Sequence, residues 1–283
     1  MSLSRRHSES DKGGAHSSET AVVFHVPHAS TDVPSHLKNT FLLSDADLQA
    51  EIIRMTDHYS DQLVGNILPA AARVRFPVSR LVVDPERFAD DSEEPMSRHG
   101  MGAIYQLTAD GRQLRKRPSP GEREELKRRF YAPHHEALTQ AVGRALAIHD
   151  RCLLIDMHSF PSRPLPCDAD QNPQRPDICL GTDEYHTPPN LAEAAALTFE
   201  KQGFSVEFNR PFAGALVPMD YYRSDPRVAA LMVEVNRRLY LDEETAERLA
   251  VFDVMREQLG EAIDSIFRCY QSRLCRRSGA SAC

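Results

Sequence analysis

The chain has 283 residues, of which 41% are hydrophobic, and its formal net charge is −7 at pH 7. This length suits one large α/β domain or two small ones, and the acidic balance argues against a nucleic-acid-binding protein, which usually carries a basic excess. No apolar run reaches membrane-spanning length and no signal-peptide core follows the N-terminus, so we expect a cytoplasmic protein without a membrane partner. The six cysteines form no CxxC pair and indicate reduced thiols.

The first predicted strand ends at a histidine. Residues 1–20 lack apolar periodicity and are expected to be disordered. Residues 21–27, AVVFHVP, have the pattern of a buried strand that gives way to a loop at His28. His25 falls inside this strand, where a hydrogen-bonded core histidine is the expected role.

Residues 42–68 predict a helix with Ser44 as its N-cap, and Pro69 would stop it. Asp57 and Asp61 would then lie four residues apart on one face. Two like charges there oppose the helix unless a bound cation or an arginine lies opposite, and a solvated acidic face is the structural alternative.

Two short strands are expected at residues 74–76 and 81–83, with Arg80, Asp84 and Arg87 around the second. An arginine at a strand end offers a planar fork for a carboxylate, although Arg80 could equally pair with Asp84. Residues 88–121 form a long polar connection of the kind that often serves as a lid or a binding loop. Its basic run, 112–117, is interpreted as a solvated surface segment because no aromatic residues are interleaved with it.

A helical pattern follows at residues 121–148, and we expect Pro133 to kink or split it. The stretch that organises the chain comes next, at residues 152–160, CLLIDMHSF. Its apolar start predicts a buried strand, after which Asp156 and His158 point the same way. Open α/β sheets carry their chemistry beyond such strand ends, so we interpret His158 as a metal ligand and Asp156 as an orienting acceptor. An incidental polar pair is the alternative.

Later strands are expected at residues 177–182, 204–208 and 228–235, and helices at 190–202 and 243–267. Asn209 and Arg210 follow the second of these strands directly. Glu234 interrupts the apolar third strand, where a buried carboxylate costs free energy unless it has a partner or a function. It is therefore the candidate general base.

This alternation predicts one α/β domain at residues 21–270, with a mixed, mostly parallel sheet and helices on both faces, followed by a loose tail at 271–283. Two histidines and a carboxylate form a common catalytic zinc set with an open water position. A separate carboxylate could take the proton from that water, and arginines could hold an anionic substrate. The pattern indicates metal-assisted amide hydrolysis.

At these residues the chain resembles the N-formylglutamate amidohydrolase family. The matching stretches are VPHAS (26–30), TDHYSDQL (56–63), SRLVVDPER (79–87), YAPHHEAL (131–138), IDMHSFPSRPLP (155–166), PDICLGT (176–182), FNRPFAGA (208–215) and ALMVEVNRRLYLDE (230–243). The resemblance implies a zinc-dependent amidohydrolase with a fold related to zinc carboxypeptidases. The implied reaction converts N-formyl-L-glutamate to formate and L-glutamate, a step in histidine breakdown.

The resemblance also implies roles for single residues. His28 and His158 would hold one zinc ion, and Glu234 would be the acid/base carboxylate. The expected substrate-binding and charge-stabilising residues are Arg80, Arg87, Arg210, Asn209 and Ser159. The carboxypeptidase pattern has a glutamate three residues after its first histidine, whereas this chain has Thr31. The other ligand must come from elsewhere; we favour Asp57, with His58, Asp32 and His25 as alternatives.

Two departures from the family pattern lie around the expected substrate pocket. DPER (84–87) stands where DxNR is expected, and LVPMDYYR (216–223) replaces a glycine-rich turn. A related metallohydrolase acting on another N-acyl amino acid or peptide is therefore the second hypothesis. A catalytically silent protein that binds a small molecule on the same scaffold is the third. The sequence leaves the oligomeric state open.

Overall fold

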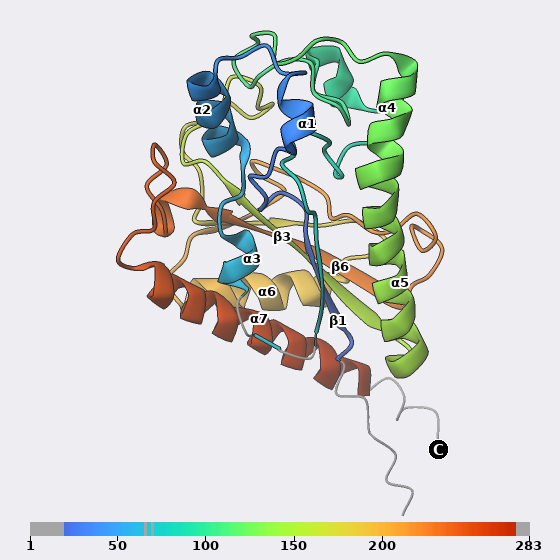
Figure 1. Cartoon of the computed structure of the whole chain (residues 1–283). Helices are drawn as coiled ribbons and strands as arrows, with labels where there is room; N and C mark the ends of the chain where they lie inside the picture. Colours follow the sequence, from blue (N-terminus) through green and yellow to red (C-terminus); the bar gives the residue numbers. More distant parts are fainter. Residues whose placement is uncertain (1–19, 65–66, 69–70, 276–283) are drawn as a thin grey trace, which may run out of the picture.

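Six strands form a single sheet in the order β2-β1-β3-β6-β4-β5 (Figure 1). The computed structural model describes residues 20–64, 67–68 and 71–275. The strands are β1 (Val22–Val26), β2 (Ala72–Arg75), β3 (Cys152–Phe160), β4 (Ile178–Gly181), β5 (Val206–Phe208) and β6 (Val228–Asn236).

The sheet is mixed but mostly parallel. Strands β2, β1, β3 and β6 run in one direction, whereas β4 pairs antiparallel with β6 and β5 follows β4. The expected single α/β domain is confirmed. The carboxyl ends of β1, β3 and β6 therefore open on one edge of the sheet, and those of β4 and β5 point the other way.

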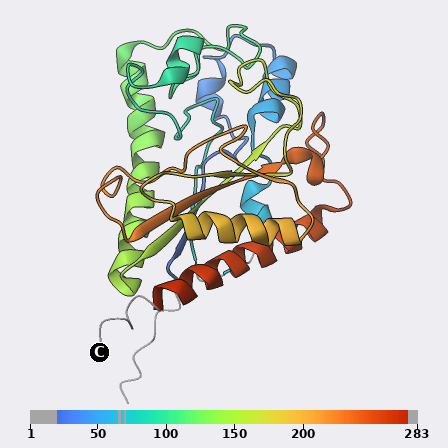
Figure 2. The same cartoon turned by 180° about the vertical axis from the view of Figure 1, so that it is seen from behind.

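Helices cover both faces of the sheet (Figures 1 and 2). Alternation along β3 assigns the faces: Leu154 packs with helix α5, whereas Ile155 packs in the cluster that contains α6 and α7. The helical segments are α1 (Ser35–Lys38), α2 (Asp45–Met55), α3 (Ser60–Leu63), η1 (Pro95–His99), α4 (Pro120–Leu126), η2 (Lys127–Tyr131), α5 (Ala132–His149), α6 (Pro189–Lys201), η3 (Arg237–Leu239) and α7 (Phe252–Cys275).

The helix expected at residues 42–68 is two helices. Ser44 caps α2 as expected and accepts a hydrogen bond from the Asp47 N–H, but α2 ends at Met55. The chain then turns through Tyr59, whose φ of 63° is left-handed, before α3 begins. Asp57 lies in this turn, so it does not share a helix face with Asp61, which pairs with Arg75 at 2.9 Å.

Two other local predictions also differ from the structure. Residues 81 and 82 lie in a turn and residue 83 is irregular, so no strand forms there, although all three residues are buried. Pro133 does not split its helix, because the preceding turn, η2, is a π-helix and α4, η2 and α5 run on without a break. A wider π turn accommodates a residue that lacks the backbone N–H.

The closing helix, α7, begins at Phe252 and not at residue 243, and it continues to Cys275. Residues 271–275, expected to be loose, are therefore helical. Of the tails predicted at 1–20 and 271–283, residues 1–19 and 276–283 lie outside the described residues. Within the described part of the chain, no helix combines the length and apolar character needed to cross a membrane.

Candidate metal centre and active site

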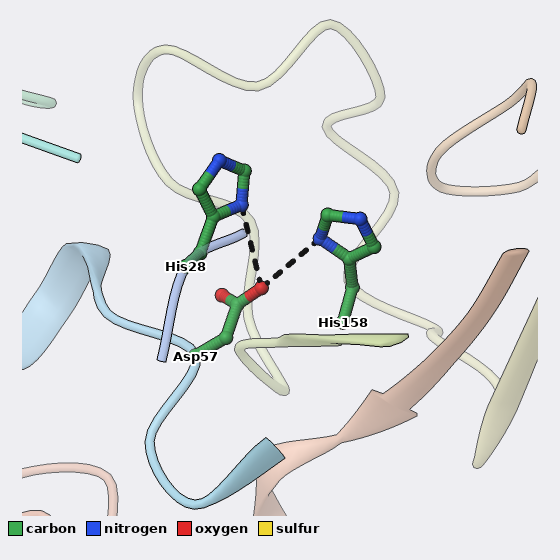
Figure 3. A group of neighbouring side chains, drawn as sticks. All are labelled: His28, Asp57 and His158. Carbon is green, nitrogen blue, oxygen red and sulfur yellow. Dashed lines mark hydrogen bonds and ion pairs between the residues drawn. The ribbon is translucent and has the colours of Figure 1, made fainter. Parts of the chain in front are cut away.

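Three buried side chains from separate segments converge at the carboxyl edge of β1 and β3 (Figure 3). His28 follows β1, Asp57 comes from the turn between α2 and α3, and His158 lies near the end of β3. Asp57 Oδ2 is 3.6 Å from His28 Nδ1 and 3.2 Å from His158 Nδ1. One nitrogen or oxygen from each residue lies within 4.8 Å of the others, so the group could hold a metal ion.

Backbone and side-chain hydrogen bonds fix Asp57 in this position. Its N–H donates to the His28 carbonyl oxygen at 3.0 Å, which joins the α2–α3 turn to the end of β1. Arg237 Nη2 donates to Asp57 Oδ1 at 2.8 Å, and the same guanidinium donates to the Ser159 and Arg54 carbonyl oxygens. With Oδ1 engaged, Oδ2 is the oxygen that faces the two histidines.

Two further carboxylates set the histidine tautomers. His28 Nε2 lies 2.8 Å from Asp84 Oδ1, and His158 Nε2 lies 3.0 Å from Asp156 Oδ1. A carboxylate only accepts, so each Nε2 carries a proton, and Nδ1 is the nitrogen of each ring that would coordinate a metal ion between the histidines and Asp57. His28 Nδ1 is buried and has no hydrogen-bond partner. Carboxylate-oriented histidines with free nitrogens are the usual form of metal-binding histidines.

The surroundings of the His158 ring favour positive charge. Burial opposes a charged His158, but Asp156, Asp57 and Glu86 outweigh it and raise the pKa of that ring well above its usual value. Burial also opposes a charged Asp57, but the hydrogen bond from His158 and the nearby His28 and Arg237 lower the pKa of this carboxyl well below its usual value. These conditions suit a bound cation.

Glu234 lies beside His158 on the neighbouring strand. The two residues are register partners in the parallel β3–β6 pair, so their side chains share a face. Glu234 is 6% exposed and its Oε2 atom has no partner. Burial raises the pKa of this carboxyl to about 8, against the opposing effect of His158.

Arg80 and Arg87 reach the site through Asp84. Arg80 Nη2 donates to Asp84 Oδ2 at 2.7 Å, and its Nε also contacts Tyr105 Oη at 3.1 Å. Arg87 Nε is 3.7 Å from the same carboxylate oxygen. The pairing of Arg80 with Asp84, one of the two options that the sequence left open, is therefore present.

The structure gives three other expected substrate residues different surroundings. Arg210 pairs with Glu207 and Asp170, and it follows β5, which runs opposite to β1 and β3. Asn209 bonds Thr182 within a turn. Ser159 follows His158 in β3 and points to the opposite face, where its Oγ meets Arg237.

The alternative ligands are not part of the His28 group. His58 lies 3.2 Å from the Ile53 carbonyl oxygen, and Asp32 is exposed. His25 is fully buried between Asp156 and His134, at 2.8 Å from each, as expected for a hydrogen-bonded core histidine.

Comparison with known proteins now decides the family. A model of the family described as N-formylglutamate amidohydrolase matches residues 20–241. The chain belongs to the N-formylglutamate amidohydrolase family. A search of curated proteins gave no match.

Two solved structures share the fold of this family member. The crystal structure of N-formylglutamate amidohydrolase from Ralstonia eutropha JMP134 aligns with a TM-score of 0.76 and 22% identity, covering 90% of this chain and 95% of that one. A gene product from Agrobacterium tumefaciens aligns with a TM-score of 0.63 and 20% identity, covering 87% and 92% respectively.

Sequence reasoning missed several residues around the centre of this amidohydrolase-family chain. Arg237 was not singled out, although it follows the Glu234 strand and pairs with the Asp57 carboxylate. Glu86 lies 3.3 Å from His25 and 3.9 Å from His158. Glu86 lies in DPER, where the chain departs from the family pattern, and this departure is the sequence feature that could have identified it.

Glu86 belongs to a second close group, with His25 and Asp156, whose ligand atoms also lie within 4.8 Å of one another. Asp156 Oδ1 already accepts hydrogen bonds from His25 and His158. His25 Nε2 then accepts from His134 on α5. This group therefore has the hydrogen-bonding pattern of a support for His158.

Proposed function

We propose that this chain hydrolyses N-formyl-L-glutamate to formate and L-glutamate, using one zinc ion held by His28, Asp57 and His158. The observation that carries the proposal is the convergence of two histidine Nδ1 atoms and one carboxylate oxygen beside Glu234, whose buried Oε2 atom has no partner. Family membership supports amide hydrolysis. With this substrate, the protein would serve histidine breakdown in the cytoplasm.

Two histidines and a carboxylate match a catalytic zinc set. A zinc ion there supplies Lewis acidity to the substrate carbonyl and to a water. Glu234 takes the proton of the attacking water and returns it to the departing amine nitrogen, so it acts first as base and then as acid. Its burial keeps this carboxyl in an environment where gaining a proton is favourable.

The arginines handle the negative charges of the substrate. Arg80 uses Nε and Nη2 for Asp84 and Tyr105. Its Nη1 donates to no acceptor among the described residues and would stabilise charge growing on the formyl oxygen. Arg87, whose side chain is 26% exposed, would bind a substrate carboxylate.

Glu86 favours a second candidate within the same chemistry, an N-acyl amino acid other than formylglutamate. A carboxyl beside His25 and His158 would repel a second substrate carboxylate if ionised. A Glu86→Asn variant separates the two candidates, because it should leave formylglutamate turnover little changed if that is the native substrate. A gain of tenfold or more would favour the second candidate.

The decisive experiment combines elemental analysis with a panel of N-formyl, N-acetyl and N-succinyl amino acids on one preparation. We expect about one zinc per chain, the stoichiometry of a single three-residue site, and preferential turnover of N-formyl-L-glutamate. Asp57→Asn should lose both metal and turnover. Asp61→Asn is the matched control, because Asp61 pairs with Arg75 outside the site and should retain both.

If the protein turns over another acyl amide but not formylglutamate, the proposed substrate is wrong and the proposed metal centre stands. A metal-free preparation with unchanged ligand binding in His28→Ala and His158→Ala variants would instead support the silent binding protein and end the hydrolase proposal.

A further inference from the structure

The sequence suggested that the basic run at residues 112–117 is a solvated segment. In the structure it is only partly solvated. Arg112 is exposed and pairs with Asp47 and Asp110, but Arg115 is only 3% exposed. The Arg115 guanidinium donates to the Leu81 and Val82 carbonyl oxygens. The buried, charged guanidinium of Arg115 is therefore hydrogen-bonded to backbone carbonyl oxygens.

Arg115 has no carboxylate partner among the described residues. Its Nε is a buried donor without an acceptor, and the guanidinium carbon lies 4.7 Å from the centre of the Phe41 ring. Burial, with a smaller contribution from the charge of Arg123, lowers the pKa of Arg115 to about 10. An unpaired buried guanidinium is costly, and a bound anion would offset that cost.

A cavity of about 600 Å³ lies against this residue. Its lining includes Arg115, Arg117 and Arg123, and the only acidic residue in the described lining is Asp91. Asp91 pairs with Arg123 at 2.6 Å, which leaves the other two arginines without a carboxylate. Gln106 and Gln113 add polar side chains. A second cavity shares Arg115 and Arg117, so both arginines lie between two hollows.

We propose that this cavity is an anion-binding site, separate from the metal centre, for a small molecule that carries a phosphate or carboxylate group. Guanidinium groups bind both anions through paired N–H donors. The volume falls in the range of small-molecule sites, about 300–1,000 Å³. None of its lining residues belongs to the His28 group.

The site has a physical route to the metal centre. Arg115 holds the carbonyl groups of Leu81 and Val82, and these residues lie between Arg80 and Asp84. Asp84 in turn orients His28. Arg115 is thus hydrogen-bonded to the segment that carries Asp84, and Asp84 orients the proposed metal ligand His28. An anion that binds Arg115 would therefore contact a side chain attached to this segment.

Calorimetric titration of the metal-loaded protein with inorganic phosphate, at ionic strength fixed with sodium chloride, tests the proposal. Arg117→Ala removes an exposed lining residue and should weaken phosphate binding at least tenfold. Arg112→Ala is the matched control, since it removes the same charge from the same run but outside the lining, and its affinity should stay within twofold of the parent. Both variants should keep the parent turnover.

Titration with succinate distinguishes a phosphate ligand from a carboxylate ligand. The anion that binds more tightly, with an affinity that depends on Arg117, identifies the chemical class of the ligand. The proposal is overturned if the parent shows no saturable binding of either anion. It is also overturned if Arg117→Ala and Arg112→Ala lose affinity equally, which indicates general electrostatics, or if neither loses any, which places the bound anion elsewhere.

Discussion

Replacing Glu234 by glutamine separates the catalytic and structural effects of this buried carboxylate. Glutamine keeps the size and one oxygen of the side chain but cannot accept the proton of a water. Loss of a positioned general base typically lowers turnover about 10²–10⁴-fold, and we expect kcat of Glu234→Gln to fall in that range. Because Glu234 is not in the proposed ligand set, the zinc content should not change.

The same substitution should stabilise the metal-free protein. The pKa of Glu234 rises from 4.5 to about 8 on folding, so the unfolded chain releases this proton more readily. At pH 7 the difference opposes folding by about 3 kcal/mol, from the linkage between proton binding and stability. The penalty vanishes below pH 4.5, where both states are protonated, and it grows as the pH rises toward 8.

Urea unfolding of chelator-treated protein at pH 4.5 and pH 7 measures this effect, alongside kcat and zinc content of the loaded enzyme. Glu207→Gln is the control, because Glu207 is a partly exposed residue of β5 paired with Arg210 and should change neither stability nor turnover appreciably. Activity of Glu234→Gln within threefold of the parent would refute the base role. A loss of stability at pH 7 would show that the carboxylate has a native partner and refute the desolvation argument.

Three other predictions follow from contacts around the centre. Asp84→Asn removes the charged acceptor that orients His28 and should weaken zinc binding about 10–100-fold, measured by competition with a chromogenic chelator. Burial lowers the pKa of His134 to about 2, so its contribution to stability is present above pH 6.5 and is lost as the pH falls from 6.5 toward 2. The parent should therefore lose about 2 kcal/mol from this residue between pH 7 and pH 5, and His134→Gln should show a correspondingly flatter pH dependence in urea unfolding; equal slopes would contradict this. Arg87→Ala should raise KM about tenfold, the cost of one charge-assisted contact, whereas Arg210→Ala should leave KM within twofold; the reverse order would restore Arg210 as the substrate anchor.

The sequence by itself determined the main elements of the sheet and two of the three proposed metal ligands. Apolar runs predicted the buried strands β3 and β6, and the polar residues that interrupt or follow such runs drew attention to His28, His158 and Glu234. These signals are local, because the apolar residues of a strand predict its own burial. A polar group in such a strand costs free energy unless it has a partner or a function.

Only the tertiary structure decided which side chains share a site. Asp57 was one of four candidate ligands, and a break in the predicted helix joined to the end of β1 brings it to the histidines. Arg210 looked equivalent to His28 because both follow strands, but β5 runs the opposite way. The burial of Arg115 was equally hidden in its basic run. Strand direction and the burial of a long side chain depend on pairing between distant segments, and the periodicity of one segment carries no information about its partners.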